Sequence, residues 1–217
     1  MVPVLRLYED TLSNAADGLR LPARPRMIFV VHGSASVDGA TLRDGEAWHG
    51  EGAVTLTAGA TGVTCWRFEL TGDAEDRASA AEGISSREKL AAPLHTLPAG
   101  DLLLRGDSVG FPAGGCAYLH RHAGPGIRAL LDGGIRIDTH GRSTSYGPGG
   151  AWFESGPDPV FAQAAADRPS RFIRVMILPR GLLGKSSIQY LDPADADKPK
   201  VQQYKSFADM PIAFRAG

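Results

Sequence analysis

Two histidines, His120 and His122, stand two residues apart at the end of an apolar run that glycines bound on both sides. Side chains two apart on a strand point to the same face, so in a small β-barrel both imidazoles would point into the interior. Neutral imidazoles that converge in a pocket are good ligands for a divalent metal. By the same alternation Cys116 and Tyr118 would face the interior too. The pair therefore predicts either a metal site or two hydrogen-bonded core histidines.

The spacing around the histidines resembles the first sequence motif of the cupin superfamily. Gly114, His120, His122 and Gly133 stand where that motif has two glycines and a His-x-His pair. Gly126 stands where the motif has a glutamate ligand. The resemblance implies a metal-binding β-barrel, here without the ligand that the first motif supplies after its histidines.

A second stretch, residues 149–164, is similar to the second cupin motif, but Val160 occupies its histidine position. Two imidazoles alone hold a divalent ion weakly, so a third ligand is needed. Glu154 is the nearest carboxylate within this stretch, and Gln163 is a weaker candidate. Two histidines and one carboxylate form the facial arrangement that leaves positions open on Fe(II). Alternatively, Glu154 is a solvated loop residue or an ion-pair partner.

Arg128 is the least expected residue near the histidines, because counting by twos from Gly126 points it into the barrel. A buried guanidinium without a partner is costly. One interpretation is an internal ion pair with Asp132 or Glu154. The other is a clamp on a substrate carboxylate or phosphate, for which the planar guanidinium is well suited. Both can hold if the arginine changes partner when substrate binds.

Composition narrows the class of protein. The 217 residues carry a formal net charge of −1 and a pI of about 6.6, which argues against a nucleic-acid-binding face. The sequence has no apolar segment long enough to suggest a membrane span, and its first residues do not resemble a signal peptide. The two cysteines, Cys65 and Cys116, are expected to be free thiols. We therefore expect a cytoplasmic protein.

The remaining sequence predicts an all-β chain, since turn residues recur about every eight to twelve positions. The halves show a weak repeat in which Val31-His-Gly33 matches Leu131-Asp-Gly133, and Trp48 matches Trp152. We interpret the chain as a bicupin, two double-stranded β-helix (jelly-roll) barrels. Its expected parts are a first barrel over residues 1–92, a second over 93–180 and a tail over 181–217. A helix is expected from Asp73 to Leu90.

The repeat also indicates which barrel carries the site. It places Arg20 and Pro22 in the histidine positions of the first half and Leu56 opposite Val160. The first barrel is therefore expected to lack a metal site. The tail carries aromatic residues, and we expect it to support a homodimer; these are Tyr204, Phe207 and Phe214.

The resemblance implies a metal-dependent enzyme, dioxygenase-like or isomerase- or lyase-like, that acts on a small organic acid or polar aromatic compound in the second barrel. Its cofactor would be a divalent transition metal (Fe, Mn, Ni or Zn), held by His120, His122 and Glu154. Glu154, Arg128 and Tyr118 would be the catalytic residues, with Tyr118 donating a hydrogen bond. The alternative is a non-catalytic small-ligand-binding or sensory bicupin.

Overall fold

The computed structural model describes residues 2–72 and 81–214, and the described chain is almost entirely β-structure. It divides into two compact units, unit 1 over residues 1–93 and 212–217 and unit 2 over residues 94–211. No helix within the described ranges is long and apolar enough to cross a membrane.

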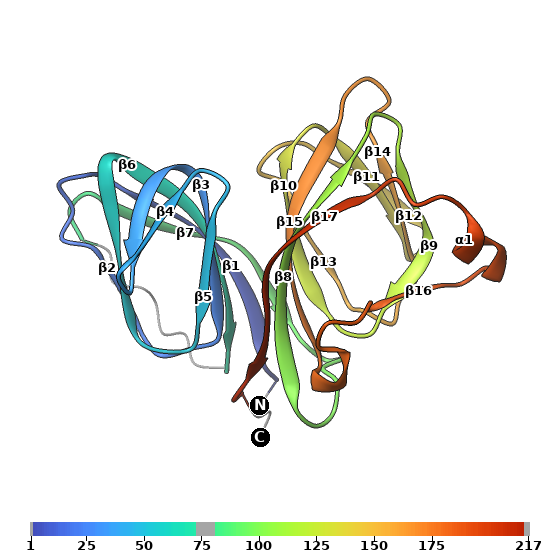
Figure 1. Ribbon diagram of the computed structural model, residues 1–217, viewed down its shortest axis with the longest axis horizontal. Coiled ribbons are helices and arrows are strands. Elements are labelled where there is room, and N and C mark those ends of the chain that lie inside the picture. The colour runs from blue at the N-terminus through green and yellow to red at the C-terminus, as the bar shows by residue number, and fades with distance from the viewer. Residues whose placement is uncertain (1, 73–80, 215–217) are drawn as a thin grey trace. The chain divides into compact units, whose positions relative to one another are not determined.

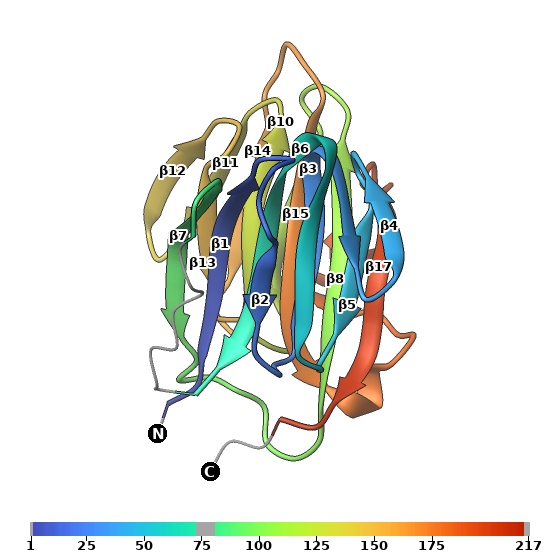
Figure 2. The same cartoon turned by 90° about the vertical axis from the view of Figure 1, so that its left-hand side faces the viewer.

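Unit 1 is one antiparallel sheet with the strand order β4-β3-β6-β1-β7, and β2 and β5 pair with β6 and β3. Figure 2 shows β7, β1, β6 and β3 side by side. Alternate residues of these strands fill an apolar interior that includes Ile28, Val30 and Cys65. The strands are β1 (Val4–Leu12), β2 (Leu19–Leu21), β3 (Arg26–Val37), β4 (Ala40–Arg43), β5 (Ala47–Gly50), β6 (Val54–Thr71) and β7 (Ile84–Pro93).

Unit 2 contains two five-stranded antiparallel sheets, β13-β10-β15-β8-β17 and β12-β11-β14-β9-β16. Figure 1 shows these strands curving around a common interior. The strands are β8 (Leu102–Phe111), β9 (Cys116–His122), β10 (Gly126–Asp132), β11 (Ile135–Thr139), β12 (Arg142–Tyr146), β13 (Ala151–Glu154), β14 (Val160–Ala164), β15 (Ser170–Pro179), β16 (Ile188–Tyr190) and β17 (Gln203–Ile212). A 3-10 turn (Arg180–Leu182) and a short helix, α1 (Pro193–Asp197), precede β17.

Inside unit 2, the inward-facing residues of five strands, β8, β9, β10, β13 and β15, are apolar at one end of the strand and polar at the other. Trp152 and Phe172 belong to the apolar cluster, whereas the next inward residues on their strands are Glu154 and Arg174. The same change occurs on β8, β9 and β10. The polar end is formed by His120, His122 and four charged residues that we call the charged band, namely Asp107, Arg128, Glu154 and Arg174.

The strand register bears out the internal repeat. In each unit, one row of residues that pair across neighbouring strands begins with a tryptophan and has an arginine in third place. The row is Trp48, Ile28, Arg67 and Tyr8 in unit 1, and Trp152, Arg128, Arg174 and Asp107 in unit 2. Arg128 therefore stands where unit 1 has Ile28.

The register corrects the expected histidine positions of the first half. Leu19 lies opposite Leu56, just as His120 lies opposite Val160. The interior positions thus hold the buried Leu19 and Leu21, while Arg20 is exposed. Placing Arg20 and Pro22 there was wrong by one residue. Because leucine offers no ligand atom, this part of unit 1 is unsuited to a metal.

The prediction of a helix over Asp73–Leu90 is also wrong for the part of that range that the structure describes. Residues 84–90 belong to β7, which pairs with β1 along its length. Local composition favoured a helix, but the open edge of β1 supplies a full ladder of backbone partners. Residues 73–80 lie outside the described residues.

The C-terminal segment adds β16 to β9 and β17 to β8.

Gly156 should be intolerant of a side chain. Its φ is +101°, and a Cβ there would lie 2.5 Å from the carbonyl carbon of Gly124. Its own carbonyl accepts a hydrogen bond from the His122 amide at 2.8 Å. We expect Gly156→Ala to lower the free energy of unfolding by about 2 kcal/mol, measured by urea denaturation.

Gly141→Ala is the matched control, because Gly141 also has a positive φ, +69°, but nothing lies within 4 Å of its added Cβ. Its loss should be clearly smaller. Equal losses at both positions would show that the close approach to Gly124 does not constrain the strand that carries the histidines.

Candidate functional site

The strand β9 reaches the polar end through a β-bulge. Val160 pairs with His120 and Ala162 pairs with Ala117, so two steps along β14 correspond to three along β9. Tyr118 and Leu119 have no pairing partner on β14. The His120 Nδ1 atom lies 2.6 Å from the Tyr118 carbonyl oxygen and donates to it. The bulge therefore turns His120 inward and fixes its ring through its own strand.

Both histidines are neutral at neutral pH. Burial lowers the pKa of His120, although the bond to the Tyr118 carbonyl opposes this. Burial also lowers the pKa of His122 well below its usual value, and the nearby charges of Arg128 and Arg174 add to the effect. Because Nδ1 of His120 carries the proton, its Nε2 is left as a hydrogen-bond acceptor.

Arg128 is an ion-pair partner of Glu154. The guanidinium is 1% exposed, and its Nη2 lies 2.7 Å from Glu154 Oε2. Nη1 donates to the Gly126 carbonyl at 2.7 Å, and Glu154 Oε1 accepts from Trp152 Nε1 at 2.9 Å. Burial lowers the pKa of Arg128 to about 10, and the Glu154 carboxylate opposes that shift. The arginine is therefore charged at neutral pH.

The hydrogen-bond geometry of this ion pair is poor. Although the two charged atoms are close, neither Arg128 Nη2 nor Glu154 Oε2 has a hydrogen-bond partner of acceptable geometry. One further buried side-chain atom within the described residues shares this condition, Gln202 Oε1. All three residues line the same inner cavity. The unmet hydrogen-bonding capacity of the described chain thus gathers at one place, which is typical of a ligand or water site.

Arg174 lies directly opposite Arg128 in the sheet, where two like charges repel each other. Asp107 balances this second arginine with two bonds of 2.9 and 2.6 Å. The pair is well aligned, in contrast to Arg128 and Glu154. Arg174 therefore makes aligned hydrogen bonds to its carboxylate partner, whereas Arg128 has a donor atom without an aligned acceptor.

The inner cavity is small, with a volume of about 30 Å³, room for roughly two water molecules. His120, His122, Arg128, Glu154 and Gln202 line it at its polar end. A larger pocket of about 210 Å³ adjoins it. Four residues line both spaces, namely His122, Arg174, Ile188 and Tyr204. A ligand could therefore place a compact head inside and the rest of its body in the outer pocket.

The structure brings together most of the residues singled out in the sequence. His120, His122, Arg128 and Glu154 converge, and His122 Nε2 lies 3.8 Å from Glu154 Oε2. Of the two partners considered for Arg128, the structure has Glu154. The other, Asp132, pairs with Arg171 at 2.8 Å.

Three expected residues lie elsewhere. The bulge breaks the alternation, so the expectation that Tyr118 and Cys116 share the histidines' interior face is wrong. Tyr118 instead lies beneath Lys198, whose Nζ is 4.7 Å from the ring centroid. Gln163 donates to the Gly114 carbonyl at 2.7 Å and does not line the cavity.

The sequence reasoning missed Asp107, Arg174 and Gln202. Alternation along the strand Phe172–Leu178 could have identified Arg174 as inward-facing, since Phe172 and Arg174 are two apart. Asp107 follows in the same way from Val109. No local pattern identifies Gln202, because it lies between α1 and β17 and reaches the site only through the tertiary fold.

The arrangement does not fit the expected divalent metal. Within the described ranges, no group of three or more histidine, cysteine or carboxylate side chains is placed to hold an ion. Glu154 is turned onto the Arg128 guanidinium. A Cβ at Gly126, the family's glutamate position, would meet the Val175 carbonyl oxygen at 2.5 Å and Arg128 Nη1 at 3.0 Å. The protein's own cation lies beside the histidines and uses the carboxylate that a metal would need.

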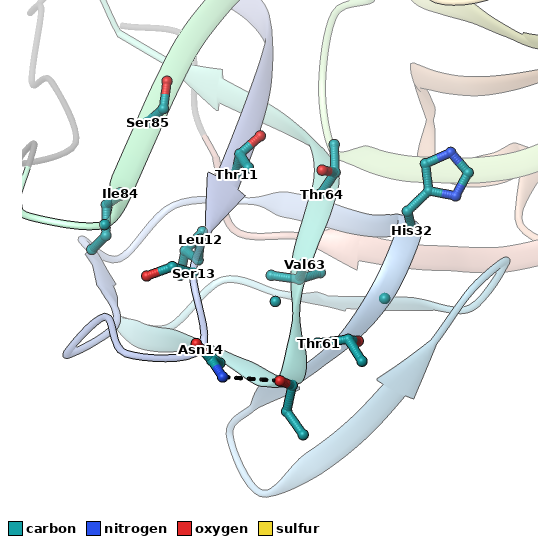
Figure 3. A pocket seen from close by; sticks show the side chains of 14 residues that line it. Thr11, Leu12, Ser13, Asn14, His32, Thr61, Val63, Thr64, Ile84 and Ser85 are labelled. Atoms are coloured by element: carbon teal, nitrogen blue, oxygen red, sulfur yellow. Dashed lines mark hydrogen bonds between the residues drawn. The ribbon is translucent and has the colours of Figure 1, made fainter.

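A second hollow, of about 850 Å³, lies in unit 1 (Figure 3). Asn14 crosses part of it to donate to the Ala60 carbonyl at 3.0 Å. Hydroxyl groups of Thr11, Ser13 and Thr61 lie around it, and His32 is its one titratable lining residue. Most of these residues are exposed. Without converging charges or a buried polar group, this hollow is a weaker candidate than the cavity of unit 2.

Sequence comparison does not assign a family to the chain, since neither a family model nor a curated protein matches it. Comparison of structures does find relatives in fold. An oxalate decarboxylase from Lactobacillus farciminis, solved as a formate complex, superposes with a TM-score of 0.65 over 89% of this chain and 82% of that chain, at 14% identity.

Two further structures agree. An oxalate decarboxylase variant from Bacillus subtilis gives a TM-score of 0.63 over 89% of this chain and 73% of that chain, at 12% identity. A cupin 2 conserved barrel domain protein from Leptotrichia buccalis gives 0.50 over 81% and 84%, at 11% identity. The chain therefore has the all-β jelly-roll fold of cupin proteins, as the sequence predicted; similarity at this level of identity concerns the fold alone.

Glu154→Gln tests the ion pair, because the amide keeps the shape of the side chain and the Trp152 bond but removes the charge. Arg128 would then be buried without an anion. Since its guanidinium cannot lose its proton at neutral pH, the free energy of unfolding should fall by about 3–5 kcal/mol, measured by urea denaturation.

The double variant Arg128→Met/Glu154→Leu removes both charges and should lose less than Glu154→Gln alone. If Glu154→Gln unfolds within about 0.5 kcal/mol of the wild type, Arg128 does not depend on this carboxylate.

Proposed function

We propose that the chain is a bicupin whose second barrel binds a small organic acid, with Arg128 as the group that holds the ligand's carboxylate. The observation that carries this proposal is the buried Nη2 atom of Arg128. It faces a cavity and has no aligned acceptor. A ligand carboxylate could accept the charge-assisted hydrogen bond that Glu154 leaves unmade. The proposal combines the non-catalytic alternative drawn from the sequence with the clamp suggested for Arg128.

Charge balance defines how such a ligand would bind. Arg128 and Arg174 are already matched by Glu154 and Asp107, so an added anion would leave the buried band with a net negative charge. Asp107 is firmly held by two bonds, whereas Glu154 is badly aligned with its arginine. The ligand's carboxylate therefore takes the place of that of Glu154 on Arg128, and one proton enters with the acid so that the charge of the buried band does not change. This is the change of partner that the sequence allowed.

Rescue of Glu154→Gln by small carboxylates tests the exchange. In this variant the competing charge is gone and Arg128 lacks an anion, so formate or acetate should raise the melting temperature more than in the wild type. We expect about tenfold tighter binding than to the wild type, measured by isothermal titration calorimetry. Chloride at equal ionic strength is the control for screening.

Arg128→Lys should bind acetate about ten- to a hundredfold more weakly than the wild type, since an ammonium cannot reproduce the planar fork. Were Glu154→Gln to bind no carboxylate, or Arg128→Lys to bind as the wild type does, the anion site would be wrong.

A metal-dependent enzyme is the second candidate function. One observation favours it: His120, His122 and Glu154, the donor types of a facial metal site, lie at one end of the barrel, and Nε2 of His120 is free to act as a ligand. Such a reaction would require Glu154 to leave Arg128.

Elemental analysis of protein purified without chelator separates the two candidates. Because Glu154 is committed to Arg128, we expect well below one equivalent of transition metal per chain. One equivalent in the wild type, lost in His120→Ala/His122→Ala, would favour the enzyme instead.

A further inference from the structure

We infer that the acid bound beside Arg128 carries a hydroxyl group next to its carboxylate, so that the ligand class is the 2-hydroxy acids. This inference rests on the proposed function and adds the chemical identity of the ligand's head. It follows from counting hydrogen-bond donors and acceptors around the inner cavity, one side chain at a time.

Three buried side-chain atoms of the described residues lack a hydrogen-bond partner, namely one donor, Nη2 of Arg128, and two acceptors, Oε2 of Glu154 and Oε1 of Gln202. A carboxylate oxygen of the ligand uses the donor. A simple carboxylate has acceptors alone, so it leaves every acceptor of the cavity wall as it was before binding. Those acceptors decide whether a carboxylate suffices or a donor is also required.

Gln202 supplies the first spare acceptor. Its Nε2 donates to the Cys116 carbonyl at 3.0 Å, which fixes the orientation of the amide and makes the other atom the oxygen. That oxygen, Oε1, is buried and has no donor. A buried acceptor left unpaired destabilises the protein, so a ligand that brings a hydroxyl hydrogen recovers part of this cost.

His120 supplies the second. Its Nδ1 donates to the Tyr118 carbonyl at 2.6 Å, and this bond selects the tautomer in which Nε2 carries no hydrogen. Nε2 is therefore an acceptor. A bare carboxylate oxygen placed against it would bring two lone pairs together, whereas a hydroxyl would donate to it.

The size of the cavity places the hydroxyl close to the carboxylate. About 30 Å³, the room for roughly two water molecules, leaves no space for a donor on a longer arm. A donor that must reach Gln202 or His120 within this space sits on the carbon adjacent to the carboxylate. The remainder of the ligand extends toward the outer pocket of about 210 Å³, where Ser186 and Ser187 among others provide polar surface.

Matched ligand pairs test the inference on the wild-type protein. Glycolate differs from acetate by one hydroxyl group, and lactate differs from propionate in the same way. We expect each hydroxy acid to bind about tenfold more tightly than its partner in isothermal titration calorimetry, the effect of one added hydrogen bond to a buried acceptor.

Gln202→Met removes the orphaned acceptor at similar volume. It should reduce the ratio of glycolate to acetate affinity, and far-UV circular dichroism of the variant checks that it is folded. Gln163→Met is the matched control, since Gln163 is hydrogen-bonded to backbone on the same sheet but does not line the cavity. It should leave the ratio unchanged.

The outcomes separate the two proposals. Equal affinities for glycolate and acetate, or a ratio that Gln202→Met does not lower, overturn the hydroxy-acid inference and leave the carboxylate site standing. If neither acid binds the wild type and none rescues Glu154→Gln, the carboxylate site is wrong and the inference falls with it.

Discussion

Two guanidiniums, those of Arg128 and Arg174, face each other across neighbouring strands inside one barrel, and the chemistry of unit 2 depends on how their charges are balanced. Like charges in direct register repel, and neither guanidinium can escape by losing its proton at neutral pH. Asp107 balances one arginine with two aligned bonds. Glu154 balances the charge of Arg128, but its Oε2 atom makes no well-aligned hydrogen bond with Nη2 of that arginine. The orphaned Nη2 and Oε2 atoms follow from this unequal pairing, and so does the turning of Glu154 away from the histidines toward Arg128.

Unit 1 shows what the same row looks like when it has no such problem. Ile28 stands at the position of Arg128, so Arg67 has no like-charged residue opposite it. Arg67 is bonded to Asp10 at 2.6 Å and 3.1 Å and paired with Glu69 at 2.6 Å. The charge and hydrogen-bond donors of Arg67 are therefore matched by side chains of unit 1 itself. Within this row, unit 2 has a second inward arginine where unit 1 has Ile28, and that arginine is the proposed contact for a ligand.

Alternation along strands allowed much of this to be predicted from the sequence. It identified the inward histidines, Arg128, its pairing with Glu154 as one of two possible partners, and strands such as Val160–Ala164. It failed where the backbone departs from alternation or where tertiary pairing prevails over local preference. The bulge before His120 misplaced Tyr118 and Cys116, and the open edge of β1 made a strand of residues expected to be helical. The homodimer expected from the tail stays a prediction.

The bulge in β9 also decides which single-residue changes of chain length the site can accept. Three residues of β9 cover the span of two on β14, so an odd number of steps joins two residues that face the same interior. Removing one residue between Ala117 and His120 would leave them two apart, the spacing at which an unbulged strand keeps both side chains on one face. The extra residue is therefore not needed to point the histidines inward. Its consequence is local, because the bulged backbone is what presents the Tyr118 carbonyl to Nδ1 of His120.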